Sequence, residues 1–204
     1  MQQSATKIQA TNPVERARQQ PSRLRRIIKC TYRFALHFFA ILGLLSAVYH
    51  LGFDVDQMIS PSMSPTLWGD GPDGGDQVLC ERITYTLRQP RRWEIVRFRD
   101  RYGMVLMKRV AALPGETIGI ADGRIVINGK PHDPPRGLEH LKYIGYGALR
   151  EDQTYTCGNG YFLLGDDSKD SHDSRFEKEL PPHRILARSV MIVWPPNRMR
   201  WIVP

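Results

Sequence analysis

The apolar and polar residues of this chain follow two different patterns in succession. Residues 34–53, FALHFFAILGLLSAVYHLGF, contain no Asp, Glu, Lys or Arg. A helix of this length rises about 30 Å, which is the thickness of the hydrocarbon core of a bilayer. The first pattern therefore predicts a transmembrane anchor helix over residues 34–53.

Short runs rich in Val, Ile, Phe, Tyr and Trp follow the apolar segment, and such runs are typical of strands. Asp122-Gly123 and Asn128-Gly129 lie where two-residue hairpin turns are expected. Residues 131–153 lack the pattern and are expected to form an irregular excursion. The runs are residues 76–83, 93–100, 104–113, 116–121, 124–129, 161–166 and 185–194. Residues 54–204 are therefore predicted to form one mainly β domain.

The positive charge of the chain is concentrated before the apolar segment. The formal net charge is +8, and residues 1–33 hold eight Lys and Arg against one acidic residue, Glu15. Because Lys and Arg are retained on the cytoplasmic side, residues 1–33 are predicted to be a basic cytoplasmic tail, with the β domain extracytoplasmic, or periplasmic. This placement explains the charge without a nucleic-acid partner.

A cleaved signal peptide is the alternative to an anchor, and it fits less well. The basic region is long, the apolar region exceeds the usual length of about 7–15 residues, and bulky Leu45 precedes Ala47 at the cleavage-site spacing. The predicted topology separates Cys30 from the exported Cys80 and Cys157. The latter two could form a disulfide or remain buried thiols, and their spacing does not decide between these states.

Residues 59–67, ISPSMSPTL, are the first candidate for chemistry. A polar turn is the simpler interpretation, because a serine becomes a nucleophile only when a base is available. Four exported histidines could supply a Ser-His-Asp arrangement, although no serine lies in a G-x-S-x-G elbow. The histidines are His132, His140, His172 and His183.

Lys108 is the other candidate base, because it lies within the apolar run MVLMKRVAAL over residues 104–113. Burial disfavours the ammonium form and lowers the pKa of a lysine, which leaves a neutral amine that can accept a proton. Arg109 alternates to the opposite face of the strand, where it can reach solvent or a carboxylate. A lysine whose head snorkels from an edge strand is the simpler alternative.

Four stretches in order after an N-terminal anchor resemble the type I signal peptidases, the serine-lysine endopeptidases that remove signal peptides. The resemblance extends from about residue 34 to residue 194. The stretches are SPSMSPTL at 60–67, GDQVL at 75–79, KR with LPGE at 108–109 and 113–116, and GDDSKDSHDSR at 165–175. The resemblance implies a mainly β domain, built as a β-ribbon or partly open barrel, behind one transmembrane helix.

The resemblance also implies a role for each matching residue. Ser62 matches the acylating serine, Lys108 the general base, and Ser60 the hydroxyl that assists the backbone amide of Ser62 in the oxyanion hole. Alternation in an extended segment would place both serines on the same side. Ser171 matches the serine that hydrogen-bonds the lysine, and Asp173 and Arg175 match the charges that support its loop. No metal or cofactor is implied.

An extended substrate peptide is expected to bind by edge pairing beside the serine, in small pockets that accept alanine-sized side chains. Core packing is the simpler interpretation of these positions. The expected substrate-binding residues are Gln57, Met58, Ile59 and Met107.

The last stretch departs from the family, which commonly has Asn, Arg and Asp where this chain has Asp167, Ser168 and Lys169. We expect altered support of the loop in an active enzyme. Asp166, Asp167 and Asp170 could suggest a Ca²⁺ loop, but the spacing lacks the terminal Glu of an EF-hand.

The sequence thus predicts a membrane-bound serine endopeptidase whose partners are signal-peptide-bearing precursors and the lipid bilayer of the inner membrane. One alternative keeps the dyad and restricts the substrate, as in a peptidase that matures a conjugation pilin. Another is a non-catalytic module that binds exported peptides. Self-cleaving repressors share the serine-lysine chemistry and a related β core, but they carry a DNA-binding region in place of an anchor.

Overall fold

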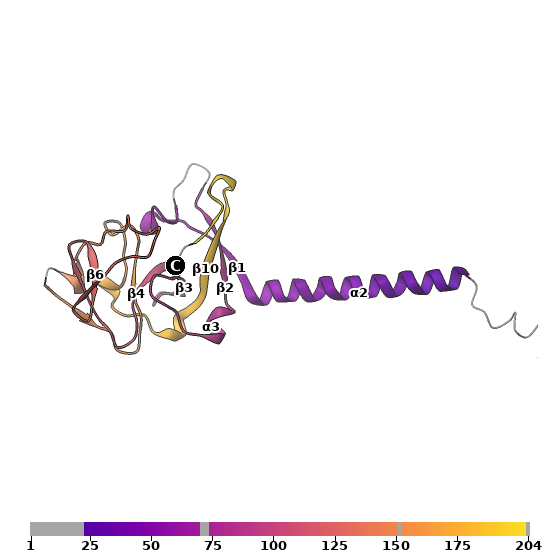
Figure 1. The fold of residues 1–204 in the computed structure, drawn as a ribbon, viewed down its shortest axis with the longest axis horizontal. Coiled ribbons are helices and arrows are strands. Elements are labelled where there is room, and N and C mark those ends of the chain that lie inside the picture. Colours follow the sequence, from indigo (N-terminus) through magenta and orange to yellow (C-terminus); the bar gives the residue numbers. More distant parts are fainter. Residues whose placement is uncertain (1–22, 70–73, 151, 203–204) are drawn as a thin grey trace, which may run out of the picture. The chain divides into compact units, whose positions relative to one another are not determined.

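The computed structural model describes residues 23–69, 74–150 and 152–202. The described chain divides into two compact units between Tyr49 and His50. Most of the first unit is one long helix, and the second is built of strands (Figure 1). The mainly β prediction is confirmed.

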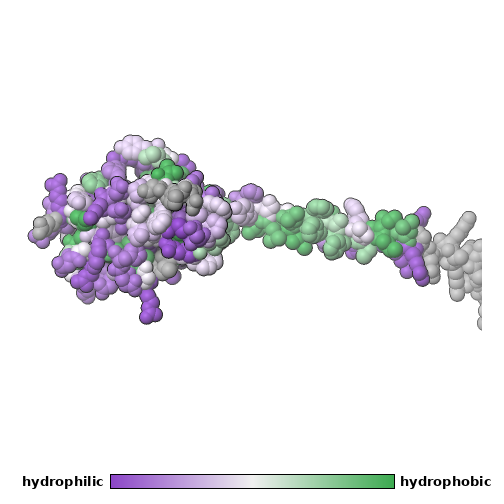
Figure 2. Space-filling view, turned by 90° about the horizontal axis from the view of Figure 1, so that it is seen from above, coloured by the Kyte–Doolittle hydropathy of each residue, from purple (hydrophilic) through white to green (hydrophobic). Residues whose placement is uncertain are grey.

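Helix α2 (Arg23–Gly52) has 30 residues, so it is about 45 Å long. It is long and apolar enough to cross a membrane. Its apolar side chains are exposed, and Figure 2 shows them as green surface over much of the helix, interrupted by paler residues. It begins at Arg23, inside the predicted basic tail; residues 1–22 of that tail lie outside the described residues.

A seven-stranded antiparallel sheet carries most of the second unit. Its strands follow the order β1-β2-β10-β3-β4-β9, and β11 pairs with β10. The strands are β1 (Phe53–Gln57), β2 (Gln77–Glu81), β3 (Ile95–Arg99), β4 (Val105–Ala112), β9 (Phe162–Leu164), β10 (Ile185–Trp194) and β11 (Arg200–Trp201).

A smaller four-stranded antiparallel sheet follows the order β7-β6-β5-β8. Its strands are β5 (Thr117–Ala121), β6 (Arg124–Ile127), β7 (Lys130–His132) and β8 (Tyr155–Thr156). Asp122-Gly123 and Asn128-Gly129 form the two turns, and all four residues have positive φ between 50° and 78°. This is the type I′ geometry that suits the twist of a hairpin, so both predicted turns are confirmed.

Each of the seven predicted runs contains a strand. Strands β7, β8 and β11 were not predicted, and β7 includes residues 131 and 132, which were expected to be irregular. Strand β1 was not predicted either. Its sequence FDVDQ alternates apolar and polar residues, which is a strand signal, but it is short and directly follows the helix. Pairing with β2 and ion pairs between its two aspartates and Arg82 and Arg97 hold it in the sheet. These contacts come from residues distant in sequence, and they decide its conformation.

The remaining helical pieces are short: α3 (Thr84–Leu87), α4 (Ser174–Glu177), and the 3-10 turns η1 (Pro61–Met63), η2 (Gly147–Leu149), η3 (Pro182–Arg184) and η4 (Pro196–Arg198). Met107 of β4 packs with Met58 and Met63 in one buried cluster. Val110 of β4 packs in another with Leu163 of β9. Strand β4 therefore lies between two parts of the core. Cys80 and Cys157 are free and buried.

Candidate active site

Ser62 lies in the short 3-10 turn η1, which residues 58–60 connect to the end of β1. Pro61 occupies the first position of this turn, where its fixed φ suits the helix and its missing N–H is not needed. The side chain is 7% exposed. Sequence analysis predicted an extended segment here, and this was wrong for Pro61–Met63, because the proline starts a helical turn.

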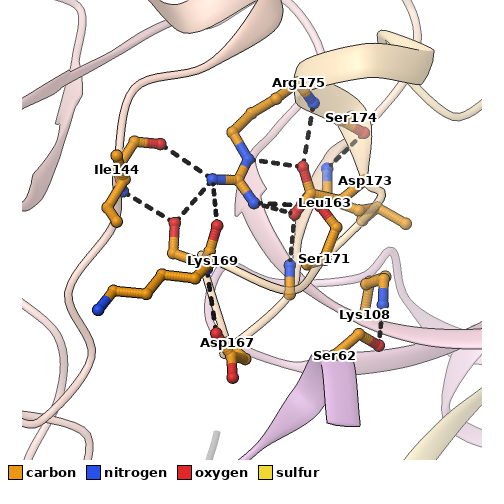
Figure 3. Close-up of polar contacts among 12 residues, drawn as sticks. Ser62, Lys108, Ile144, Leu163, Asp167, Lys169, Ser171, Asp173, Ser174 and Arg175 are labelled. Carbon is orange, nitrogen blue, oxygen red and sulfur yellow. Dashed lines mark hydrogen bonds and ion pairs between the residues drawn. The ribbon is translucent and has the colours of Figure 1, made fainter. Parts of the chain in front are cut away.

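Lys108 projects from the middle of β4, opposite Val96 of β3, and is 4% exposed. Its Nζ is hydrogen-bonded to Ser62 Oγ (Figure 3). The two residues are 46 positions apart in the chain. Folding thus places the one hydroxyl directly beside the one amine that the sequence had singled out.

Burial lowers the pKa of Lys108 to about 8, from 10.5. Nearby carboxylates, Asp173 and then Asp166, oppose this shift because they favour the ammonium form. A pKa near 8 leaves about one lysine in ten neutral at pH 7. The amine can therefore act as a base near neutral pH.

Ser60 precedes the turn in an extended conformation, and its Oγ lies 3.1 Å from Ser62 Oγ. Ser62 Oγ is thus in contact with both the Lys108 amine and the Ser60 hydroxyl. The two serine hydroxyls do face each other, as the sequence predicted, although the proline turn rather than strand alternation brings them together.

Gly165, at the end of β9, brings the loop of residues 165–175 against the nucleophile. A Cβ at this position would lie 2.5 Å from the carbonyl oxygen of Ser62 and would overlap the Ser171 side chain. The same carbonyl oxygen accepts a hydrogen bond from Asp167 N at 3.2 Å. Only a glycine permits this approach of the two backbones.

The Arg175 guanidinium holds this loop from behind, fully buried against the Asp173 carboxylate at 2.8 Å. Asp173 Oδ2 also accepts a hydrogen bond from Gly165 N at 2.9 Å. Arg175 Nη1 further donates to the carbonyl oxygens of Ser168 and Ile144, each at 2.9 Å. Asp173 and Arg175 therefore lie together where the sequence placed the loop support.

Ser168 is the part of the departing segment that enters this network. Its buried Oγ accepts hydrogen bonds from Arg175 Nη1 at 2.7 Å and from Ile144 N at 2.8 Å. Asp167 Oδ1 instead accepts from Lys169 N and Asp170 N, which closes the turn. The side chain of Lys169 points away from the Arg175 guanidinium (Figure 3). One neutral serine thus links the irregular excursion to the loop.

Arg109 and Asp166 form a second buried ion pair, with both hydrogen bonds at 2.7 Å and both side chains fully buried. Asp166 is the carboxylate that Arg109 reaches on the opposite face of the strand from Lys108. Arg109 also donates to the carbonyl oxygen of Trp93 at 2.6 Å. The pair ties β4 to the start of the loop.

Ser171 is buried beside Gly165, but its Oγ makes no hydrogen bond within the described part of the chain. The predicted bond from Ser171 to Lys108 is therefore not formed in this structure. Its hydroxyl is close to the dyad in the fold, and its role in orienting the amine remains a prediction.

The four predicted substrate-binding residues surround one cavity of about 110 Å³, together with both dyad residues. Gln57 and Ile59 are exposed, and Met58 and Met107 line the cavity from the core. Two free sheet edges meet here. Strand β1 pairs only with β2, and β9 pairs with β4 from Arg109 onward, so residues 105–108 have one unpaired edge in the described structure.

The histidines do not form a Ser-His-Asp site. All four are exposed: His132, His140, His172 and His183. His172 lies in the loop of residues 165–175, and its ring is hydrogen-bonded to Glu177 at 2.7 Å. Sequence analysis placed Gly165 in the last matching stretch and Ser168 in the segment expected to alter the support of the loop, but it gave neither residue a role of its own. It missed Ile144, and no local pattern in the sequence indicates that residue.

Comparisons with known proteins place the chain in a family. The family described as signal peptidase, peptidase S26, matches residues 31–194. Signal peptidase I of Leptolyngbya laminosa is 30% identical over 154 residues, which are 71% of this chain and 70% of that protein. Thylakoidal processing peptidase 1, chloroplastic, of Arabidopsis thaliana is 32% identical over 69% of this chain and 42% of its own length.

A crystal structure of a signal peptidase I from Enterococcus faecalis V583 aligns with a TM-score of 0.41 and 25% identity, over 50% of this chain and 97% of that one. The family match covers both residues of the dyad and the whole loop of residues 165–175. The chain belongs to the signal peptidase family, peptidase S26.

Proposed function

We propose that this chain is a membrane-anchored serine endopeptidase that removes N-terminal signal peptides from translocated precursor proteins through a dyad of Ser62 and Lys108. The observation that carries the proposal is the hydrogen bond between Ser62 Oγ and Lys108 Nζ, two buried side chains from separate parts of the fold. Membership of the signal peptidase family supplies the substrate class.

The first chemical step is acylation of the serine. Neutral Lys108 takes the proton of Ser62 Oγ as the oxygen attacks the scissile carbonyl carbon, which produces a tetrahedral oxyanion. The amide of Ser62 and the Ser60 hydroxyl are the donors proposed to meet that charge, and losing one such donor costs about 3 kcal/mol. Lys108 then gives the proton to the departing amine.

Deacylation uses the same two groups in reverse order. Lys108, neutral again after the amine leaves, takes a proton from a water molecule that attacks the ester carbon. Collapse of the second tetrahedral intermediate breaks the ester bond and returns the proton to Ser62 Oγ. The signal peptide leaves with a free carboxylate and the mature protein with a free amine.

Substrate binding is proposed to use the two free edges beside the cavity of about 110 Å³. An extended peptide placed between β1 and residues 105–108 can pair its backbone with both, as in strand addition. Alternate side chains would then point toward Met58 and Met107, into a cavity whose volume suits small residues. This arrangement supports a preference for small-x-small sites.

The orientation in the membrane follows from charge. With the basic residues before the span retained in the cytoplasm, the catalytic domain lies on the outer, or periplasmic, face of the inner membrane, where translocated precursors emerge.

Cleavage of a precursor with an alanine-x-alanine site by the full chain in detergent micelles tests the proposal. Ser62→Ala and Lys108→Met should each abolish cleavage, and Lys169→Ala, a neighbouring change outside the network, should leave it intact. Circular dichroism establishes that each variant is folded. Cleavage retained by a folded Ser62→Ala or Lys108→Met variant would refute the dyad.

A further inference from the structure

Two hollows meet at the dyad, and only the smaller one has a role so far. The larger has a volume of about 380 Å³ and also reaches Ser62 and Lys108. The two share Ser60, Ser62, Leu106 and Lys108 and otherwise have separate linings. The dyad therefore lies at the boundary between two cavities on different sides of the reacting atoms.

The larger cavity has an apolar floor. Phe98 of β3 and Leu106 of β4 form one part of it, and Leu163 of β9 and Leu180 form another. All except Leu106 are buried, with at most 8% of their surface exposed. Tyr102 and Met104, in the β3–β4 turn, stand at the mouth and are 71% and 56% exposed.

Charged residues around this floor largely neutralise one another. Glu177 pairs with Arg101 at 2.7 Å and with His172 at the same distance. The Asp173 carboxylate forms an ion pair with Arg175. The other charged residues of the lining include both signs: Asp100, Asp170 and Glu179 are acidic, and Lys178 and Arg184 are basic. Because neither positive nor negative charge predominates in the lining, the apolar floor determines which kind of side chain the cavity can bind.

Substrate geometry assigns the two cavities to opposite ends of the cut. The carbonyl that Ser62 attacks belongs to the acyl half of the peptide, which the proposed function places along β1 in the smaller cavity. The chain continues past Ser62 into the leaving half, at about 3.3 Å per residue when extended. The first residues of that half must therefore leave the dyad on its other side, where the larger cavity begins.

Resting on the proposed function, we propose that the larger cavity is a binding site for the mature part of the substrate, and that it takes one bulky apolar side chain from the first three residues after the cut. Small side chains would be selected before the cut and a large one favoured after it. The volumes of the two cavities agree with this difference, because the cavity proposed for the residues after the cut is the larger of the two.

A peptide panel cleaved by the full chain in detergent micelles tests this site. Every peptide keeps alanine-x-alanine before the cut, and each of the first three positions after it is changed in turn from Ala to Phe or Lys. At one of these positions Phe should raise kcat/KM about tenfold over Ala, the scale for filling an apolar pocket, and Lys should not.

A variant at the mouth shows whether this cavity causes the preference. Met104→Trp adds a large ring at an exposed position that lines the cavity, so it should bring the Phe-to-Ala ratio close to one while the Ala peptide is still cut. Met199→Trp is the matched control, since Met199 is 51% exposed and lines none of the cavities described here. It should leave the ratio unchanged.

Three results would overturn the inference while leaving the peptidase intact: equal cleavage of the Ala and Phe peptides, a preference for Lys, or a Phe preference that survives in Met104→Trp. Failure of the wild type to cut any peptide, the all-Ala one included, would instead contradict the proposed function and remove the inference with it.

Discussion

Lys108 shows how the fold sets the chemistry of a single residue. In water its amine would be almost entirely protonated at neutral pH, but the strand places it in a buried position with Ser62 Oγ as its hydrogen-bond partner. Burial lowers the pKa of Lys108, and the carboxylates of Asp173 and Asp166 raise it. Desolvation is the larger effect, so the pKa falls.

The pH dependence of cleavage should report this balance. Because neutral Lys108 is the base and its pKa is about 8, kcat/KM should rise with pH through about 8 and level off above it. Steady-state rates on a precursor peptide between pH 6 and 10 measure this. A profile that is flat across the range, or one that falls, would contradict a lysine base.

The same burial links the stability of the fold to pH. The unfolded chain keeps its lysine charged up to about pH 10.5, whereas the folded protein releases that proton near pH 8. The unfolded state therefore binds more protons between these values, and the contribution of Lys108 to stability increases as the pH rises through this window. Below pH 8 the full penalty of burying a charge is present.

At the scale of elements, the loop of residues 165–175 positions the dyad without supplying the reacting atoms. It touches the backbone of Ser62 through Gly165 and Asp167, and it is held by the Arg175 guanidinium. Its shape therefore depends on contacts that a strand or helix pattern does not encode.

Gly165→Ala should reduce kcat/KM about 100-fold or more, because the added Cβ collides with the backbone of Ser62 and with Ser171, and a displacement of about 1 Å has this effect on rate. Gly119→Ala in β5 is the matched control, since its Cβ would meet the end of the Thr154 side chain at 3.2 Å and the carbonyl oxygen of Gln153 at an ordinary 3.7 Å. Peptide kinetics and thermal unfolding of both variants make the comparison. Near-normal activity of Gly165→Ala would show that catalysis does not need the close contact between the backbones of residues 165 and 62.

Ser168→Ala should weaken both the loop and the rate. It removes the acceptor of Ile144 N and one of the acceptors of Arg175 Nη1, which lowers the free energy of unfolding by about 1–3 kcal/mol. We expect kcat to fall while KM changes little, because the peptide contacts lie elsewhere. Urea unfolding and steady-state kinetics measure the two effects. Lys169→Ala controls for its position, and equal behaviour of the two variants would contradict a role for Ser168.

At the scale of the whole molecule, the described chain has an apolar helix followed by a β domain, and the basic residues that precede the apolar segment of residues 34–53 set the proposed orientation. Cys30 provides a natural probe, because it is exposed in the helix whereas Cys80 and Cys157 are buried. A membrane-impermeant maleimide should label Cys30 in inside-out vesicles but not in intact spheroplasts. Cys30→Ser should remove the signal, and labelling of Cys30 from outside would reverse the proposed topology.

The sequence by itself determined the features that depend on neighbours in the chain. Twenty residues without charge predict a span, runs of β-branched and aromatic residues predict strands, and Asp-Gly and Asn-Gly predict tight hairpins with positive φ. Ser62 and Lys108 were also recognisable, the first from its serine-proline context and the second from its apolar strand.

Only the tertiary structure decided which distant groups meet. It paired β1 with β2, brought Ser62 against Lys108, and placed Ser168 of the departing segment where it accepts hydrogen bonds from Arg175 and Ile144. It also showed that Ser171 is buried beside the dyad without a bond to Lys108. The physical reason is that hydrogen-bond geometry and burial arise when separate segments pack, whereas local sequence specifies backbone conformation and the periodicity of apolar faces.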